Sequence, residues 1–179
     1  MSHVKDRGPG CAGSRSFNSK IYLGALLVAL VAAVTFYATR LVLAVIPEGN
    51  KTPYVYSTQV GDTWNISLTH SVEKTLWEEF FRVEGVNKMT MTHTTFESLG
   101  WGFPYSAEDG KLTHRADGRY EVVMNRPFTS VPLRISVQAM QHFHHGSTDL
   151  DLCKLYGQGT KLDIRVMRRY EYWLNASNK

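Results

Sequence analysis

A polar run near the middle of the chain carries the first side chains suited to chemistry. His70 and Ser71 end a segment of alternating polar and apolar residues, and Glu79 lies in the next one. Imidazole, hydroxyl and carboxylate groups bind polar ligands, so these three are candidate ligand- or partner-binding residues. His70 is in register with the apolar side, which leaves a core histidine as the alternative. Neighbours on a strand point to opposite faces, so His70 beside Ser71 does not indicate a hydrolase.

A run of alternating glycines and aromatic residues forms the second candidate group. Gly100 and Gly102 lack a Cβ, so the backbone there can approach a ligand closely, and the aromatic residues between them offer flat contact surface. Together with Pro104 they predict a recognition loop or, alternatively, a tight bend at the corner of a sheet. The third glycine of a dinucleotide-binding loop is missing.

Three histidines close together form the third group. Imidazoles at the spacing of His142, His144 and His145 can ligate a metal, and these residues are weak metal-site candidates. The cysteine and carboxylate partners of closed metal sites are missing at diagnostic spacing, so a solvated polar loop is the alternative. We therefore predict no metal and no cofactor. The sequence has no recognisable nucleophile, base and oxyanion arrangement, which predicts that the protein is not an enzyme.

Period-two alternation of apolar and polar residues recurs from residue 64 to residue 166 and is typical of β-strands. Two of these segments are joined by Gly85–Asn87, which predicts a hairpin. The segment Ile135–Phe143 fits a strand end or, alternatively, a short helix. About seven short antiparallel strands in one compact domain predict an all-β sandwich or small barrel, preceded by one transmembrane helix.

That helix is predicted from the uncharged run Ile21–Thr39 near the N-terminus. About 20 apolar residues suffice to cross the hydrocarbon core of a bilayer. Arg40 can extend its charged end to the interface, so we expect Leu41–Ile46 to continue the anchor. Ala25, Ala29 and Ala33 recur at a spacing of four, which would allow close packing against another transmembrane helix.

Charge placement predicts the orientation of the anchor. Lys5, Arg7, Arg15 and Lys20 precede the apolar run against the single acid Asp6, so the positive-inside rule places the N-terminus in the cytoplasm. From residue 47 onward, 15 basic residues balance 15 acidic ones, so the net charge of +4 belongs to the first 46 residues. This distribution argues against nucleic-acid binding. A cleaved signal peptide is the alternative interpretation of the apolar run.

The expected protein is therefore a single-pass membrane protein whose C-terminal domain is exported. The two cysteines, Cys11 and Cys153, would lie on opposite sides of the membrane, which predicts no disulfide between them. The predicted parts are a cytoplasmic segment (1–20), the anchor (21–46), a tether (47–53), the β domain (54–174) and a tail (175–179).

Three motifs together resemble a known family. His70–Thr75, Trp77–Glu79 and Gly100–Gly102 are similar to the domain of unknown function DUF1850, and the resemblance covers roughly Tyr54–Val166. It implies a small exported or membrane-anchored protein found beside TRAP-type solute transporters of the TAXI class, without an established reaction. It also makes His70, Ser71, Glu79, Gly100 and Gly102 the candidates for a shared site.

The resemblance and the anchor together predict a function. We expect a membrane-anchored periplasmic accessory or interaction protein of a TRAP-type (TAXI) transport system. Its partner would be the transporter permease or the substrate-binding protein. The alternative is a periplasmic β module that binds a small ligand or a metal.

Overall fold

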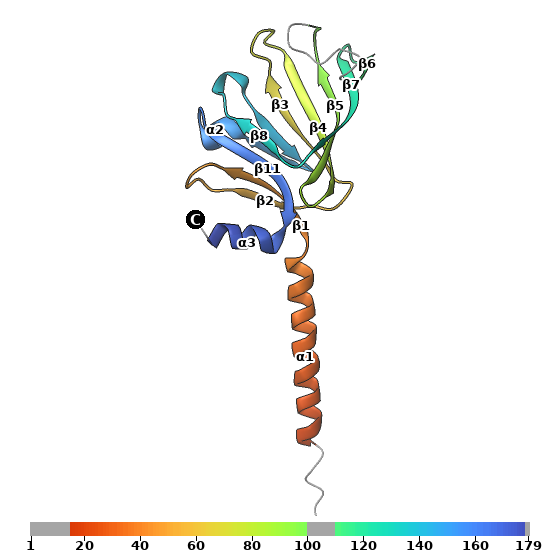
Figure 1. Cartoon of the computed structure of the whole chain (residues 1–179), viewed down its shortest axis with the longest axis vertical. Coiled ribbons are helices and arrows are strands. Elements are labelled where there is room, and N and C mark those ends of the chain that lie inside the picture. The colour runs from red at the N-terminus through yellow and green to blue at the C-terminus, as the bar shows by residue number, and fades with distance from the viewer. Residues whose placement is uncertain (1–14, 100–109, 178–179) are drawn as a thin grey trace, which may run out of the picture. The chain divides into compact units, whose positions relative to one another are not determined.

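The computed structural model describes residues 15–99 and 110–177, and its contacts divide the chain into two units (Figure 1). The first unit ends at Thr39 and contains helix α1 (Arg15–Ala38). The second begins at Arg40 and contains all eleven strands of the described residues.

Helix α1 contains the segment Ser19–Ala38, which is long and apolar enough to cross a membrane, with 20 residues and a mean hydropathy of 2.2. The helix ends at Ala38, and the N–H and hydroxyl of the next residue, Thr39, both donate to the Thr35 carbonyl, at 3.0 and 2.8 Å. Ala25, Ala29 and Ala33 all lie on this helix, where a spacing of four places them on one face. Their contact with a partner helix stays a prediction.

The helix does not continue to Ile46, and the prediction of an anchor over 21–46 is wrong at its C-terminal end. Leu41–Pro47 forms strand β1, which pairs antiparallel with β2 (Tyr54–Ser57) on one side and β11 (Lys161–Arg168) on the other. The predicted tether, residues 47–53, is mostly the turn between β1 and β2. The β domain therefore begins at Arg40, two residues after the end of α1.

Strand β1 is apolar throughout because both of its faces are covered. Leu43 and Val45 belong to the core between the two sheets, and Val42 and Ala44 belong to a second apolar cluster on the outer face. All four side chains are fully buried. A strand buried on both faces has no polar alternation, which is why this segment resembled the end of a membrane helix.

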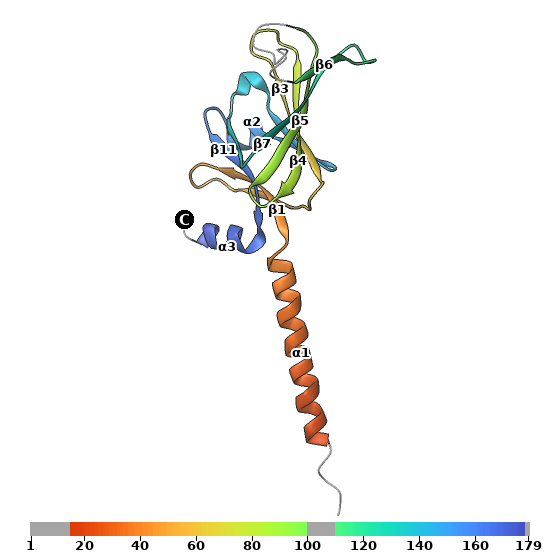
Figure 2. The same ribbon diagram turned by 45° about the vertical axis from the view of Figure 1, so that its right-hand side comes forward.

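Two open antiparallel sheets form the β domain (Figures 1 and 2). The smaller has the order β2–β1–β11–β8, with β8 spanning Val131–Arg134. The larger has the order β10–β9–β3–β4–β5–β7–β6. Its strands are β3 (Thr63–Thr69), β4 (Leu76–Gly85), β5 (Lys88–Phe96), β6 (Lys111–His114), β7 (Tyr120–Phe128), β9 (His142–His145) and β10 (Thr148–Asp151). The predicted sandwich is confirmed, as is the hairpin at Gly85–Asn87 between β4 and β5, although there are more strands than the predicted seven or so.

Short helical elements complete the domain. The alternative helix predicted within Ile135–Phe143 is limited to one 3₁₀ turn, Val137–Ala139, because β9 begins at His142. Helix α2 spans Leu152–Tyr156, and helix α3 spans Arg169–Ser177. Tyr170 and Trp173, which follow the last strand, lie on α3.

The main core fills the space between the sheets. Trp64 of β3 stacks on Phe81 of β4, with ring centroids 4.3 Å apart and an interplanar angle of 12°, and Phe143 of β9 lies 5.6 Å from Trp64. A smaller cluster centred on Phe96 and Val122 covers another part of the larger sheet. The inward side chains of the larger sheet are thus fixed by packing, and its outward side chains are held in register by the same strands.

Candidate functional site

The structure separates the two polar residues predicted at the end of β3. His70 is buried and Ser71 is exposed. A tight turn explains the arrangement: the His70 N–H donates to the Thr75 carbonyl at 2.8 Å, and the Lys74 N–H donates to the His70 carbonyl at 3.0 Å. The His70 ring nitrogen Nδ1 accepts a hydrogen bond from the Glu73 N–H at 3.3 Å. These bonds fit the alternative of a hydrogen-bonded core histidine.

His70 and Glu79 lie toward the same face of the larger sheet. The His70 ring stacks on Trp77 with centroids 5.6 Å apart, and the Trp77 indole donates to the Thr94 hydroxyl at 2.6 Å. Glu79 lies two residues from Trp77 on β4, and its Cα partner on β5 is Thr94. Two of the predicted residues are therefore close to one polar contact, the Trp77–Thr94 hydrogen bond.

Glu79 is the one inward-facing carboxylate among these predicted residues. Burial raises its pKa, and the positive charge of Arg126 opposes part of that increase. A partly buried acid with a raised pKa is typical of ligand sites and also of structural ion pairs. The predicted loop residues Gly100, Gly102 and Pro104 lie outside the described residues, so their part in a shared site with His70 and Glu79 stays a prediction.

A second polar cluster lies on the outer face of the larger sheet. Asp149 of β10 contacts two imidazoles: its Oδ1 lies 2.8 Å from His142 Nδ1 and 3.5 Å from His144 Nδ1. The other ring nitrogen of His144, Nε2, is 2.8 Å from the Ser67 hydroxyl oxygen. Three neighbouring strands thus hold a hydroxyl, two imidazoles and a carboxylate in one continuous network.

His145 does not join this network. It follows His144 on β9, so its side chain points to the inner side, where its ring lies 5.7 Å from that of Tyr56. The three predicted histidines therefore do not converge on one point. Among the residues that the structure describes, no group of three or more His, Cys, Asp or Glu side chains is arranged to hold a metal ion.

An aromatic pair extends the cluster along the outer face. His93 of β5 stacks on Phe80 of β4, with centroids 4.2 Å apart and rings 7° from parallel. A register shift between Phe80 and Phe81 places the extra residue, Thr92, just before His93. Such bulges redirect side chains. Burial lowers the pKa of His93, and the Glu121 carboxylate, 3.9 Å away, opposes that effect.

We call this surface the histidine face and define it by its outward residues Ser67, Phe80, His93, His142, His144 and Asp149. A hollow of about 600 Å³ lies beside it, lined in part by Asn65, Phe80 and His144. Next to the aromatic pair, Arg119 binds Glu78 at 2.6 Å. The surface combines an aromatic contact, hydrogen-bonding groups of both kinds and paired charges, which is the composition of a site for a polar or protein partner.

The Ser67–His144–Asp149 order matches the order of groups in a hydrolase triad, but the geometry does not. The imidazole–carboxylate distance of 3.5 Å is long for a hydrogen bond, and Ser67 lies within a regular strand paired on both sides. The backbone N–H groups near Ser67 take part in the pairing with the neighbouring strands, whereas an oxyanion hole needs free donors. The cluster is better suited to binding than to acyl transfer.

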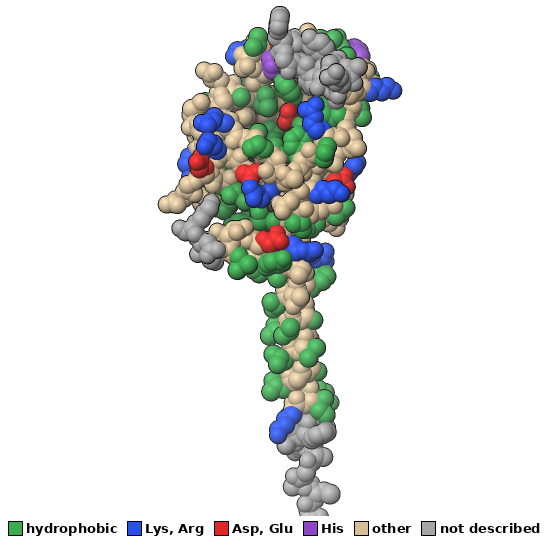
Figure 3. Space-filling view, in the orientation of Figure 1, with side chains coloured by type: hydrophobic (Ala, Val, Ile, Leu, Met, Phe, Trp, Pro, Cys, Tyr) green, Lys and Arg blue, Asp and Glu red, His purple; other side chains and the backbone are tan. Residues whose placement is uncertain are grey.

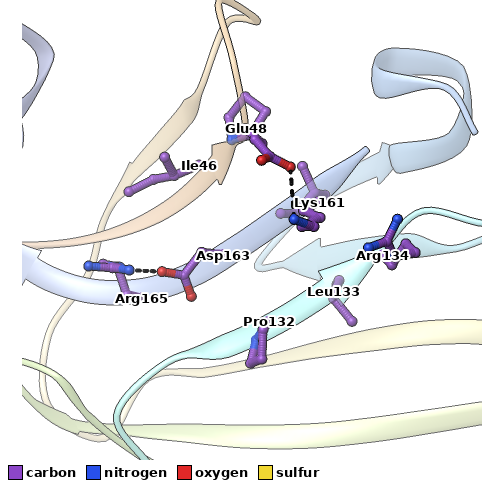
Figure 4. Close-up of a pocket in the computed structure, with 10 residues that line it drawn as sticks. Ile46, Glu48, Pro132, Leu133, Arg134, Lys161, Asp163 and Arg165 are labelled. Carbon is purple, nitrogen blue, oxygen red and sulfur yellow. Dashed lines mark ion pairs between the residues drawn. The ribbon is translucent and has the colours of Figure 1, made fainter. Parts of the chain in front are cut away.

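A groove of about 600 Å³ on the smaller sheet is a third candidate (Figure 4). Ile46 and Pro132 line it with apolar surface, and two ion pairs cross it, Glu48–Lys161 and Asp163–Arg165. Its charges are mostly neutralised within the groove.

Cys153 is a free, partly buried thiol that contacts neighbouring backbone groups. Its sulfur accepts a hydrogen bond from the Gln141 N–H at 3.2 Å, and the thiol donates to the Ser136 carbonyl at 3.4 Å. These contacts hold the 3₁₀ turn against α2. They support the interpretation of Cys153 as a small buried side chain.

Sequence reasoning missed Ser67 and Asp149 as partners of the histidines. Two signals could have identified them. His142 and His144 alternate along a strand and so share a face, and Gly146-Ser147 is a two-residue hairpin signal that brings Asp149 opposite His144. The pairing of β9 with β3, which supplies Ser67, joins residues 77 positions apart and has no local signal.

Comparison with known proteins gives one match. Searches of curated proteins and of solved structures return no match. The family model of a domain of unknown function, DUF1850, matches residues 64–152, which include β3 to β10, His70, Glu79 and every residue of the histidine face. This match supports the family predicted from the sequence motifs.

Proposed function

We propose that this chain is a membrane-anchored accessory protein of a TRAP-type (TAXI) solute transport system. The apolar helix α1 would hold it in the bacterial inner membrane, with the N-terminus in the cytoplasm and the β domain in the periplasm. The DUF1850 match supports this proposal through the transporter association that the family resemblance implies. The partner is the permease or the substrate-binding protein.

The proposed interaction role rests on the histidine face. It lies within the part of the chain that matches the family, and its groups are positioned by strands rather than by a loop. Its central side chains are partly exposed: those of His142 and His144 are 34% and 31% accessible, and that of Asp149 is 59% accessible. They can therefore exchange their present partners for those of another protein at little desolvation cost.

Affinity capture of the full chain from membranes in mild detergent tests this role. The test variant combines His142→Ala, His144→Ala and Asp149→Ala. The matched control combines Arg134→Ala and Lys161→Ala in the groove of the smaller sheet. We expect the wild type and the control to recover transporter subunits, and the test variant to recover them at least tenfold less.

Solute uptake supplies a second readout. A strain that lacks the chain should lose uptake by its transporter, and the control variant should restore it whereas the histidine-face variant should not. Equal recovery of transporter subunits by both variants would exclude the histidine face as the contact surface. Unchanged uptake in the deletion strain, with no subunit captured by the wild type, would exclude the accessory role.

A second candidate function is small-ligand binding on the inner side of the larger sheet. The observation that favours it is Glu79, whose pKa burial raises beside His70 and Trp77. Calorimetry of the full chain with organic acids, amino acids and divalent metals tests it. Binding should release heat and raise the melting temperature in the wild type, and Glu79→Gln should abolish both. A panel that produces neither signal would count against this function.

A further inference from the structure

The C-terminal helix α3 carries an exposed apolar stripe. Tyr170, Trp173 and Leu174 follow the i, i+3, i+4 spacing of one helix face and are 39%, 44% and 62% exposed. Tyr172 points to the sheet, where it packs with the outer-face cluster of Val42, Ala44 and Met167. The helix is therefore fixed to the smaller sheet by one side and presents aromatic and aliphatic surface on another.

A hydrogen bond fixes where this helix begins. The Arg169 N–H donates to the Arg40 carbonyl at 2.9 Å, and Arg168 is the Cα partner of Leu41 at the start of β1. Arg40 follows the apolar helix in the chain after a single residue, Thr39. If that helix crosses a bilayer, covalent connection alone places Arg40, and with it the first turn of α3, at the membrane surface.

The composition around α3 matches that interface. Tryptophan and tyrosine concentrate where hydrocarbon meets headgroups, because their rings are apolar and their polar atoms need water. Three arginines, Arg40, Arg168 and Arg169, lie next to one another at the start of the helix, where the Arg169 guanidinium donates to the Ser57 hydroxyl at 2.6 Å. They suit phosphate headgroups, whereas positive charge is unfavourable at a helix N-terminus in water. Hydrophobic side chains show on the surface at α3, beside basic and acidic side chains (Figure 3).

We propose that α3 is an interfacial helix that lies on the lipid bilayer through Tyr170, Trp173 and Leu174. Amphipathic helices of this kind bury their apolar face about 5–10 Å into the boundary between headgroups and acyl chains. Together with the anchor, α3 gives the β domain a second attachment to the membrane and limits its rotation about the anchor. The inference rests on the proposed anchoring and is independent of the transporter partner.

Tryptophan fluorescence of the full chain in nanodiscs tests the proposal. Lipids brominated near the headgroup end of the acyl chains quench tryptophans at the interface. We expect quenching of the wild type, loss of more than half of it in Trp173→Phe, and no loss in the matched control Trp77→Phe. Adding anionic lipid should increase the quenching attributable to Trp173.

Carbonate extraction of membranes from cells that produce the full chain tests the anchor separately from α3. Equal quenching in the wild type and Trp173→Phe, with the protein retained in the membrane, would overturn the role of α3 and leave the anchor intact. Release of the protein by carbonate would overturn both. Protection of Trp173 from lipid-borne and aqueous quenchers alike would also overturn the proposal, because it would indicate a protein partner.

Discussion

The two sheets of this domain differ in what lies on their outer faces. The four-stranded sheet has α3 packed against its outer face, where Val42 and Ala44 are fully buried. In the described part of the chain, the outer face of the seven-stranded sheet has no such helix and carries the histidine face instead. The smaller sheet is therefore closed by an apolar contact with α3 over β1 and β11, whereas the outer face of the larger sheet is polar and open.

This difference explains two sequence patterns that have opposite appearances. Strand β1 is apolar at every position from Leu41 to Pro47 because it is covered on both faces. Strand β3 alternates because its outer face meets solvent. Trp64 and Ile66 are buried, whereas Asn65 and Ser67 are less buried. An uninterrupted apolar run after a membrane segment thus fits a doubly buried strand as well as more helix.

The largest expected effect comes from placing the same charge on the two outer faces. Val42→Asp buries an unpaired carboxylate between β1 and α3 and should destabilise the domain by about 4 kcal/mol. Val123→Asp introduces the same charge at an exposed outer position of β7 and should change stability by no more than about 0.5 kcal/mol. Denaturant unfolding of the full chain in detergent measures both, and similar losses would contradict the difference between the faces.

The neighbouring glutamates of β4 compare inner and outer faces of the larger sheet. Burial raises the pKa of Glu79 above its ordinary 4.5, so the folded state favours the protonated acid. The stability linked to Glu79 is fully present below pH 4.5 and is lost as the pH rises through the folded pKa. Glu79→Gln should therefore stabilise the protein at pH 7 by about 1 kcal/mol, and this gain should disappear at pH 4.

Glu78 is the matched control on the outer face. Its carboxylate pairs with Arg119 at 2.6 Å and accepts a hydrogen bond from the Thr95 hydroxyl at 3.1 Å. Glu78→Gln should thus destabilise the protein at pH 7, by up to about 1 kcal/mol. Thermal unfolding of both variants at the two pH values gives the comparison. A stabilising Glu78→Gln or a destabilising Glu79→Gln at pH 7 would reverse the assignment of faces.

The smallest effect on stability is expected at the centre of the histidine face. Asp149 is exposed and its ion pairs with the imidazoles are accessible to solvent, so Asp149→Asn should change stability by less than about 0.5 kcal/mol. The same substitution should weaken recovery of transporter subunits in the capture experiment. A large loss of stability with no change in capture would show that the network is structural.

Local patterns were sufficient to predict the sandwich and the β4–β5 hairpin, because alternation and the turn at Gly85–Asn87 are local signals. They failed where tertiary contacts decide the outcome. Leu41–Ile46 is a strand only because β2, β11 and α3 surround it. Trp173 lies on a helix that follows directly from a strand without a turn-forming residue.

The candidate site, too, was predicted where local patterns were sufficient and missed where long-range strand pairing decides the arrangement. His70 and Glu79 were expected to be close because the family resemblance makes them candidates for a shared site, and the structure places them toward one face. The histidine face escaped prediction because Ser67 reaches His144 only through the pairing of β3 with β9. A single sequence carries no signal for such a long-range register, although it does show that His142 and His144 share a side.

Site-specific photo-crosslinking in native membranes tests the central claim most directly. A photoreactive benzophenone amino acid is placed at Phe80, on the histidine face, and separately at Arg134, on the outer face of the smaller sheet. We predict crosslinks to a transporter permease or substrate-binding protein from position 80 and none from position 134. Crosslinks to a transporter subunit from position 134 alone would contradict this claim, because the smaller sheet would then bind the partner.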